Sequence, residues 1–458
     1  MRLCVLFAAI SCFAAEPASD VQFLLGLASA APPEIAADAK LRIAEDSTAL
    51  PVNERAQLIE DAFALAASAQ HPYRRAAVEG LGADTAASYL AAVSALNFDR
   101  MSLERRAVEL MLRVKPAKAL ELFARMNRPA ISAIGCQEGL IPDVSAYWEA
   151  AAAMAMARRA DGTGQLEALF ASADSIVELA PAARLLNNTP LDADSFDLLL
   201  GALAARIESA SASYRAFAHS DAAFRAELEQ LAARASRLNL PVLRLARAYS
   251  GDLAANLKAP RCADKPQYPR QAADWFNEKF RGDLPEVKLD DMKPSGKGGG
   301  IQLDEIWTGD GNEKIRRAVQ ELRVDERGVV RSIAERRKPE WRRKLADLIG
   351  ELDSWRPEET TAFHQKATVF EALIELTPPG DGRALLLHEF VAFLGKSNVE
   401  RRAAAEWYWH AQSVHERLRL GGDAEAARSL MDAYRESGNG SLALYAALRD
   451  GVRRRGLF

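Results

Sequence analysis

Apolar residues recur at steps of three and four along most of the chain, from Val21 to about Leu257 and again from Asn312 to the C-terminus. This spacing puts them on one face of an α-helix, so it predicts a long run of amphipathic helices. Proline, glycine, asparagine or aspartate interrupts the pattern repeatedly, which predicts turns between the helices. No alternating apolar and polar pattern is long enough to predict a strand.

A helix hairpin is predicted between residues 101 and 126. The first helix places Leu103, Ala107, Leu110, Met111 and Val114 on one face, and the second places Ala119, Leu120, Phe123 and Met126 on another. Pro116 opens the second helix, since proline is tolerated in a first turn. Ser102 is the expected N-cap of the first helix.

Other prolines are predicted to mark helix boundaries, because proline breaks a helix interior. Pro51 precedes a helix expected over residues 53–70, Pro72 follows it, and Pro142 precedes a helix reaching Arg158. The remaining predicted boundaries are Pro181, Pro190 and Pro241.

We therefore expect an all-α fold, an irregular array of helix hairpins resembling an α-solenoid of the tetratricopeptide or HEAT kind. Residues 16–257 form the predicted repeat domain, residues 258–312 a Pro/Gly-rich connector, and residues 313–458 a second helical domain. A short helix with Trp275, Phe276 and Phe280 is expected in the connector. The second domain should contain helices at 338–350, 358–376, 383–395, 399–419, 423–436 and 441–454.

The first 15 residues have one arginine, an apolar core and small residues at their end, a pattern typical of a secretory signal peptide. The apolar run is about half of the roughly 20 residues that a membrane-spanning helix needs, so we expect no such span in the mature chain. Export would place the protein in the periplasm or outside the cell. A lipoprotein signal with Cys12 as the acylated residue is the alternative, and a retained anchor is a third reading.

The composition fits a folded chain, with 49% hydrophobic and 27% charged residues and a formal net charge of -4. Nucleic acid is excluded as an expected partner, because phosphate binding requires a marked basic surface. Cys136 and Cys262 are the two cysteines outside the leader, and export makes a disulfide between them reasonable. Two free thiols are the alternative, and no His or Cys lies at metal-ligand spacing from either one.

No catalytic, cofactor-binding or metal-binding signature is complete. His388-Glu389 begins the zinc-protease pattern but has no second histidine one turn on, and His410 and His415 are five residues apart. The PSGKGGG segment lacks the earlier glycine and the Ser/Thr of a phosphate-binding loop, so we interpret it as a flexible linker. Asp310 and Asn312 in TGDGNEK are interpreted as helix caps in preference to calcium ligands.

Two clusters of side chains have several interpretations. Arginines and lysines concentrate between residues 316 and 344, but interleaved acids favour a salt-bridged solvated face over an anion-binding patch. Trp407, Tyr408 and Trp409 point in three directions on a helix, so at least one should meet solvent or another subunit. The three form a candidate interaction surface, although core anchoring is favoured over ligand stacking.

Several stretches resemble a group of exported all-helical proteins of Acidobacteria-type genomes. They are IEDAFALAASAQHPYRRAA, RRAVELMLRVKPAKALELF, the Cys136 segment ending in PDVSAYWEA, Arg261-Cys262-Ala263, FEALIELTPPGDGRALLLHEFVAFL and AEWYWHA. The similarity covers most of the mature chain and rests on structural motifs. It implies no active site, and it favours Cys136 and Cys262 as structural partners.

The sequence thus predicts an exported helical-repeat protein that acts as a binding or scaffold module in the cell envelope. Its partner would be a protein, a peptide or a glycan. An all-helical enzyme acting on envelope polysaccharide is the alternative, which several carboxylates and aromatics around one pocket would support.

Overall fold

The chain folds as a long run of helices. The computed structural model describes residues 17–47, 50–128, 130–158, 162–173, 175–264, 269–289, 293–301, 305–356, 362–397 and 404–454. Across these ranges there are 21 helices and one two-stranded sheet, so the expected all-α class is confirmed. In the same ranges, no helix combines the length and the apolar character needed to cross a bilayer.

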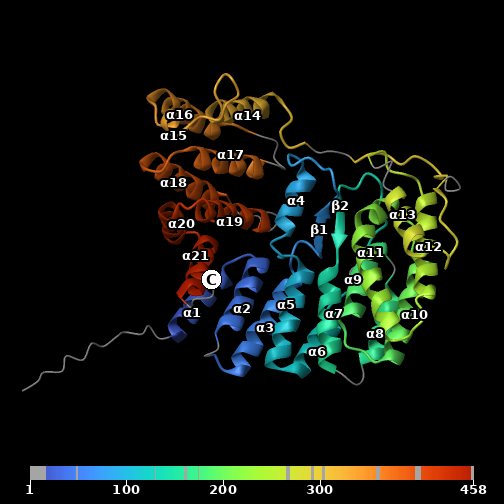
Figure 1. Cartoon of the computed structure of the whole chain (residues 1–458). Coiled ribbons are helices and arrows are strands. Elements are labelled where there is room, and N and C mark those ends of the chain that lie inside the picture. The colour runs from blue at the N-terminus through green and yellow to red at the C-terminus, as the bar shows by residue number, and fades with distance from the viewer. Residues whose placement is uncertain are drawn as a thin grey trace, which may run out of the picture.

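The first thirteen helices form an array that we call the N-terminal array (Figure 1). One layer stacks α3, α5, α7, α9 and α11 in order, while α8, α10 and α12 pack behind its far end. The helices are α1 (Pro17–Ser29), α2 (Pro33–Asp46), α3 (Val52–Ala66), α4 (Ala86–Ser94), α5 (Arg100–Val114), α6 (Pro116–Arg125), α7 (Ser145–Arg158), α8 (Gly162–Ser172), α9 (Ile176–Asn188), α10 (Ala193–Ser209), α11 (Tyr214–Arg237), α12 (Leu243–Lys258) and α13 (Pro269–Lys279).

Eight helices after residue 309 form the C-terminal array. They are α14 (Asp310–Arg323), α15 (Ile333–Arg336), α16 (Pro339–Ser354), α17 (Ala362–Leu376), α18 (Asp381–Lys396), α19 (Ala404–Leu420), α20 (Ala424–Glu436) and α21 (Gly440–Arg454). The chain between the arrays, yellow in Figure 1, runs back across the top of the N-terminal array to reach α14. The short helix expected within residues 258–312 is α13, which contains Trp275 and Phe276 and packs against α11 and α12 of the N-terminal array.

Most predicted helix boundaries agree with the structure, and two are wrong for identifiable reasons. Asp99 caps α5 in place of Ser102, because its carboxylate accepts a hydrogen bond from the Ser102 backbone N–H at 2.9 Å. Pro181 was predicted to mark a helix boundary, but it lies inside α9, which continues past it to Asn188. The apolar face of α9 is almost wholly buried, and that burial offsets the hydrogen bond that the proline removes.

A small sheet was not predicted. Strands β1 (Arg74–Ala77) and β2 (Leu140–Asp143) pair antiparallel, with Arg74 opposite Asp143 and Ala77 opposite Leu140. Four residues are too few to show an alternating pattern, and RRAA has little β-propensity. The sheet is stabilised by its neighbours, since α4 packs against β1 and Arg74 forms an ion pair with Asp143 at 2.8 Å.

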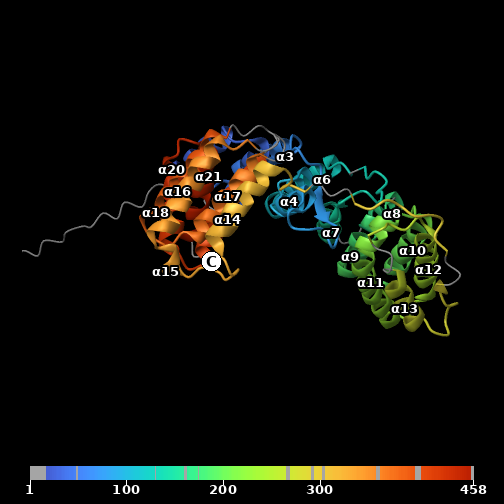
Figure 2. The same ribbon diagram turned by 90° about the horizontal axis from the view of Figure 1, so that it is seen from above.

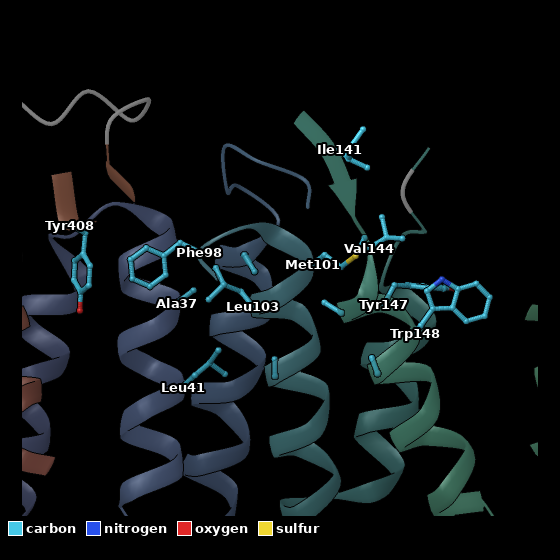
Figure 3. Close-up of a cluster of buried hydrophobic side chains, with 14 of the residues drawn as sticks. Ala37, Leu41, Phe98, Met101, Leu103, Ile141, Val144, Tyr147, Trp148 and Tyr408 are labelled. Atoms are coloured by element: carbon cyan, nitrogen blue, oxygen red, sulfur yellow. The ribbon is translucent and has the colours of Figure 1, made fainter. Parts of the chain in front are cut away.

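The two arrays dock through their first and last helices, a contact that we call the seam. Helix α21 packs against α1 and α2, and α19 packs against α2 and α4. Figure 3 shows Tyr408 of α19 facing Phe98, whose ring lies 4.8 Å away in an edge-to-face contact. One hydrophobic core runs from Val21 to Leu448, so the C-terminal array does not swing free. Seen from above, the arrays follow one bent path (Figure 2).

Candidate functional site

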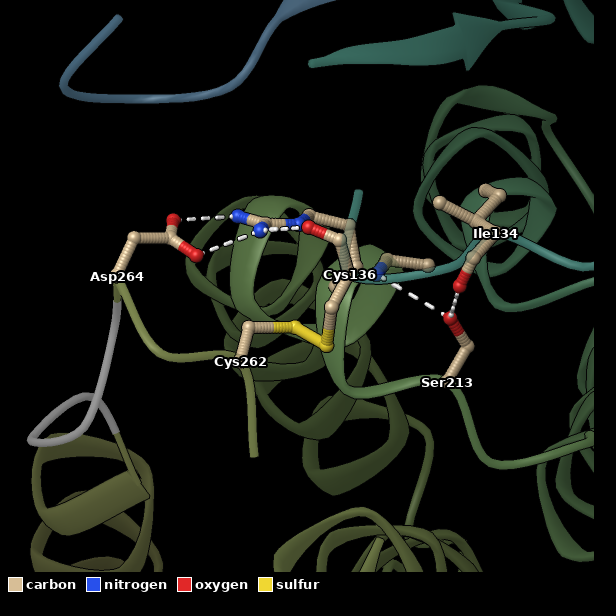
Figure 4. The surroundings of a disulfide bond; sticks show 7 residues. Ile134, Cys136, Ser213, Cys262 and Asp264 are labelled. Atoms are coloured by element: carbon tan, nitrogen blue, oxygen red, sulfur yellow. Dashed lines mark hydrogen bonds and ion pairs between the residues drawn. A yellow bond between two sulfur atoms is a disulfide. The ribbon is translucent and has the colours of Figure 1, made fainter. Parts of the chain in front are cut away.

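The predicted disulfide is present, and a buried ion pair surrounds it. Cys136 and Cys262 are bonded with their Cα atoms 5.2 Å apart, within the usual range for a disulfide. Buried Arg215 of α11 binds both carboxylate oxygens of Asp264 at 2.7 Å and donates to the Cys136 carbonyl (Figure 4). The bond therefore ties the loop before β2 to the connector, over the start of α11.

The PSGKGGG segment is not a free linker where it passes the disulfide. The Gly298 N–H donates to the Arg261 carbonyl at 2.7 Å, and the Arg261 N–H donates to the Gly296 carbonyl at 3.2 Å. A Cβ at position 298 would lie 2.5 Å from the Cys136 Sγ, so only glycine fits here without displacement. The glycine run serves close packing on the disulfide, which corrects the linker interpretation.

The aromatic run on α19 belongs mainly to the core. Trp407 and Tyr408 are 0% and 4% exposed, and the Trp407 Nε1–H donates to the Leu394 carbonyl at 3.0 Å. These two rings therefore provide no interaction surface, because α18 and the seam cover them. Trp409 is half-buried and packs edge-on against Tyr89 at 5.6 Å.

The seam brings together polar residues that are far apart in the sequence. We call Tyr89 of α4, His364 and Glu371 of α17, and Glu406 and His410 of α19 the seam cluster. The His410 Nδ1 lies 2.6 Å from the Glu371 Oε1, and its Nε2 lies 3.1 Å from the His364 Nδ1. A carboxylate only accepts hydrogen bonds, so we assign the His410 proton to Nδ1, and Nε2 then accepts from His364.

Tyr89 joins this chain from the N-terminal array. Its hydroxyl donates to the Glu406 carboxylate at 3.3 Å, and its ring stacks on His364 with centroids 3.4 Å apart. The second oxygen of Glu371 accepts from Ser413 at 3.2 Å and pairs with Arg417 at 3.3 Å. The cluster thus links α4, α17 and α19 by hydrogen bonds in a mostly buried space.

Burial raises the pKa of the Tyr89 hydroxyl, and it also alters the acidity of two other groups in the seam cluster. Burial, together with the neighbouring His410, lowers the pKa of His364 to about 3. Burial raises the pKa of Glu406, although the hydrogen bond from Tyr89 opposes that change. Both shifts favour the neutral forms, because an uncompensated charge is costly in this space.

The seam cluster should make stability fall in acid. Unfolded His364 takes up a proton below about pH 6.5, whereas the folded form resists it down to about pH 3, so stability is lost as pH falls through this window. At pH 5 the expected loss is about 1–2 kcal/mol. The raised pKa of Glu406 acts in the opposite sense, because the folded form of this carboxyl takes up its proton before the unfolded form does as pH falls toward 4.5.

Thermal unfolding of the wild type and of His364→Gln at pH 7 and pH 5 measures this effect. The variant should lose less stability than the wild type between the two values. His388→Gln, which changes an exposed histidine on α18, is the matched control and should behave like the wild type. Equal acid sensitivity of His364→Gln and the wild type would show that His364 does not titrate as expected.

An open groove lies beside the seam cluster, between the turn before α4 and the first turns of α14. Its volume is about 630 Å³, within the roughly 300–1,000 Å³ typical of small-molecule sites. We call it the seam groove, and it is lined by Gly82, Ala83, Asp84, Thr85, Glu305, Trp307, Thr308, Glu313, Arg316, Arg317 and Gln320.

Helix α14 forms one wall of the groove, and the residues that it contributes lie on one face of the helix. Glu313, Arg316, Arg317 and Gln320 follow the three and four residue steps of one helix face. Arg316 reaches across to Asp84 with a separation of 3.8 Å, and both side chains are more than 60% exposed. Such an exposed, long ion pair contributes little to stability, so a ligand can displace it.

The floor of the groove is held in place by both arrays. The Ile306 N–H donates to the Asp84 carbonyl at 3.0 Å, and the Ile306 carbonyl accepts from buried Gln365 of α17. The half-buried ring of Trp307 stacks on Trp355, with the two planes 12° apart. The Trp355 Nε1–H in turn donates to buried Asn312 at 3.1 Å. Trp307 therefore has a fixed position before any ligand arrives.

Other predicted candidates have structural roles or lie outside the described chain. Asn312 is inside α14 and its amide donates to the Thr308 carbonyl at 2.8 Å, and neither it nor Asp310 caps the helix through a side chain. Several charges of the basic cluster form exposed ion pairs, such as Lys344 with Glu321 at 3.7 Å. Within the described residues no set of three His, Cys, Asp or Glu side chains is arranged for a metal. The leader at 1–15 and Cys12 lie outside the described residues.

Neither the groove nor the role of Tyr89 could be predicted from the sequence. The residues come from turns and helices more than two hundred positions apart, and only docking of the arrays unites them. A sequence pattern that could have indicated the groove lies in α14, where Glu313, Arg316, Arg317 and Gln320 fall on the same face of the helix. No family model, curated protein or solved structure matches the chain.

Proposed function

We propose that this protein is an exported binding module of the cell envelope, and that it holds its ligand in the seam groove. The observation that carries the proposal is the groove itself, a pre-formed hollow in which an aromatic ring and acidic, basic and amide side chains converge. The signal-type leader and the disulfide support export, because disulfides persist in oxidising compartments.

The position of the groove suits a binding module. It is formed only when the C-terminal array docks on the N-terminal array, since Asp84 and Thr85 come from one and α14 from the other. A ligand that contacts both walls would therefore bind the docked form preferentially and stabilise the seam.

Sedimentation with insoluble bacterial cell-wall polysaccharide tests the proposal with the full exported chain. The wild type should co-sediment, and Trp307→Ala should weaken the apparent affinity about tenfold or more by removing the ring of the floor. Trp275→Ala is the matched control, because Trp275 is a half-buried tryptophan on distant α13. Equal binding by the wild type and Trp307→Ala would contradict the groove as the site.

The second candidate is an enzyme that cleaves envelope polysaccharide. The observation that favours it is the presence of Asp84, Glu305 and Glu313 around one groove that also has a tryptophan, since glycoside hydrolysis uses paired carboxylates. Release of new reducing ends from the same wall material, abolished by Glu305→Gln or Glu313→Gln, would favour the enzyme. Binding without release favours the module.

A further inference from the structure

We infer that the ligand of the seam groove is a short oligosaccharide that bears a carboxylate, an inference that rests on the proposed function and names the ligand class of the same site. Three properties of the groove lead to it. They are the ring on the floor, the neutral and acidic hydrogen-bonding groups on the walls, and two arginines on α14 that are available to an anion.

The floor suits a sugar ring. The indole of Trp307 lines the groove, is half-buried and stacks on Trp355, so it contributes a rigid apolar group to a lining that is otherwise largely polar. The C–H faces of a sugar pack on such a ring, while its hydroxyls need polar partners around the edge. Thr308 and Gln320 supply a hydroxyl and an amide at this edge, and Asp84 and Glu305 supply acceptors.

Arg316 and Arg317 are the reason to expect a carboxylate on the ligand. Arg317 forms no ion pair within the described part of the chain, and the only ion pair of Arg316 there is the long, exposed one with Asp84. A guanidinium binds a carboxylate through two parallel hydrogen bonds, an arrangement that is stronger than the exposed pair it replaces. A ligand carboxylate can therefore bind Arg317 and replace Asp84 as the ion-pair partner of Arg316.

The same walls disfavour other ligands. Asp84, Glu305 and Glu313 repel a polyanion such as a polyphosphate chain, so the groove suits a ligand of low charge. An extended peptide usually adds to an unpaired strand edge, but Thr85 and Glu305 already form a β-bridge with each other at the groove. A sugar needs no such edge.

Titration calorimetry with defined probes tests the inference on the full chain. The probes are cellobiouronic acid, which is a disaccharide with a single carboxylate, its methyl ester, a disaccharide containing muramic acid, and a neutral tetrapeptide. One of the two acids should bind, and where cellobiouronic acid binds it should do so about tenfold or more tightly than its ester. Arg317→Gln should remove most of the affinity for the acid, and Arg317→Lys should restore part of it.

Arg323→Gln is the matched control, because Arg323 is an exposed arginine at the end of α14 and does not line the groove. It should bind like the wild type. Failure of both acids to bind, or equal affinity for cellobiouronic acid and its ester, overturns the inference. Binding of the ester or the peptide that depends on Trp307 would keep the seam groove as the site while refuting the acidic sugar. Acid binding that survives both Trp307→Ala and Arg317→Gln would refute the site itself.

Discussion

Replacing both Cys136 and Cys262 by alanine is expected to lower the free energy of unfolding by about 4 kcal/mol. The disulfide joins residues 126 positions apart, and a loop of this size strongly restricts the unfolded chain. The variant also loses the contacts that the disulfide makes with the Gly298 backbone. Urea unfolding of the oxidised wild type and of the double variant measures the difference.

Reduced wild-type protein provides the internal control for this prediction. It should unfold at nearly the same urea concentration as the double variant, because both lack the same cross-link. If the reduced protein and the double variant were as stable as the oxidised wild type, the loop would already be constrained without the disulfide. The ion pair between Arg215 and Asp264 would then be the remaining link.

Replacing Asp252 by asparagine is expected to stabilise the protein at pH 8 by about 2–4 kcal/mol. Asp252 of α12 is 4% exposed, and its Oδ2 has no hydrogen-bond partner in the described structure. Burial, together with the nearby carboxylate of Asp221, raises its pKa to about 7. The unfolded carboxyl ionises near pH 3.8, so folding becomes less favourable as pH rises from there to 7.

Asparagine keeps the shape of the protonated acid and removes this cost. The side-chain oxygen can still accept from Asn256, which donates to the Asp252 Oδ1 at 3.0 Å. The gain should nearly vanish at pH 4, where folded Asp252 is protonated. Thermal unfolding at pH 4 and pH 8 measures both values, and Asp274→Asn changes an exposed acid on α13 as the control. The same gain at both pH values would mean that ionisation is not its cause.

The helices could be predicted because each one contains its own signal. The spacing of Leu103, Ala107, Leu110 and Met111 predicted the buried face of α5, and Pro116 predicted the start of α6. The errors have local causes. Asp99 was an equally good cap three residues earlier than Ser102, and Pro181 gave a false boundary because tertiary burial outweighed its helix-breaking effect.

The groove could not be predicted because its parts share no local pattern. Asp84 lies in a turn, Trp307 in an irregular segment and Arg317 on a helix, and each has an ordinary solvated interpretation alone. These residues come together only because the two arrays dock. That docking depends on contacts such as Tyr408 with Phe98 and Tyr89 with Glu406, which join segments more than three hundred residues apart.

The seam accounts for both the fold and the proposed function. Neighbouring helices pair along the chain, whereas the seam joins the first helices to the last, and both arrays supply residues that line the seam groove. The buried seam cluster stabilises this contact from inside, and the ion pair between Arg316 and Asp84 bridges it weakly from outside. A ligand in the groove that contacts both walls would add contacts between the two arrays on the solvent side of the seam.

Hydrogen exchange with and without saturating cellobiouronic acid tests the central claim most directly, because it locates the ligand on the chain. We expect slower exchange in residues 82–94 and 305–320, which form the two walls of the seam groove, and no change in residues 243–258 of distant α12. Protection centred on the far end of the N-terminal array, or no protection of either wall, would contradict the account.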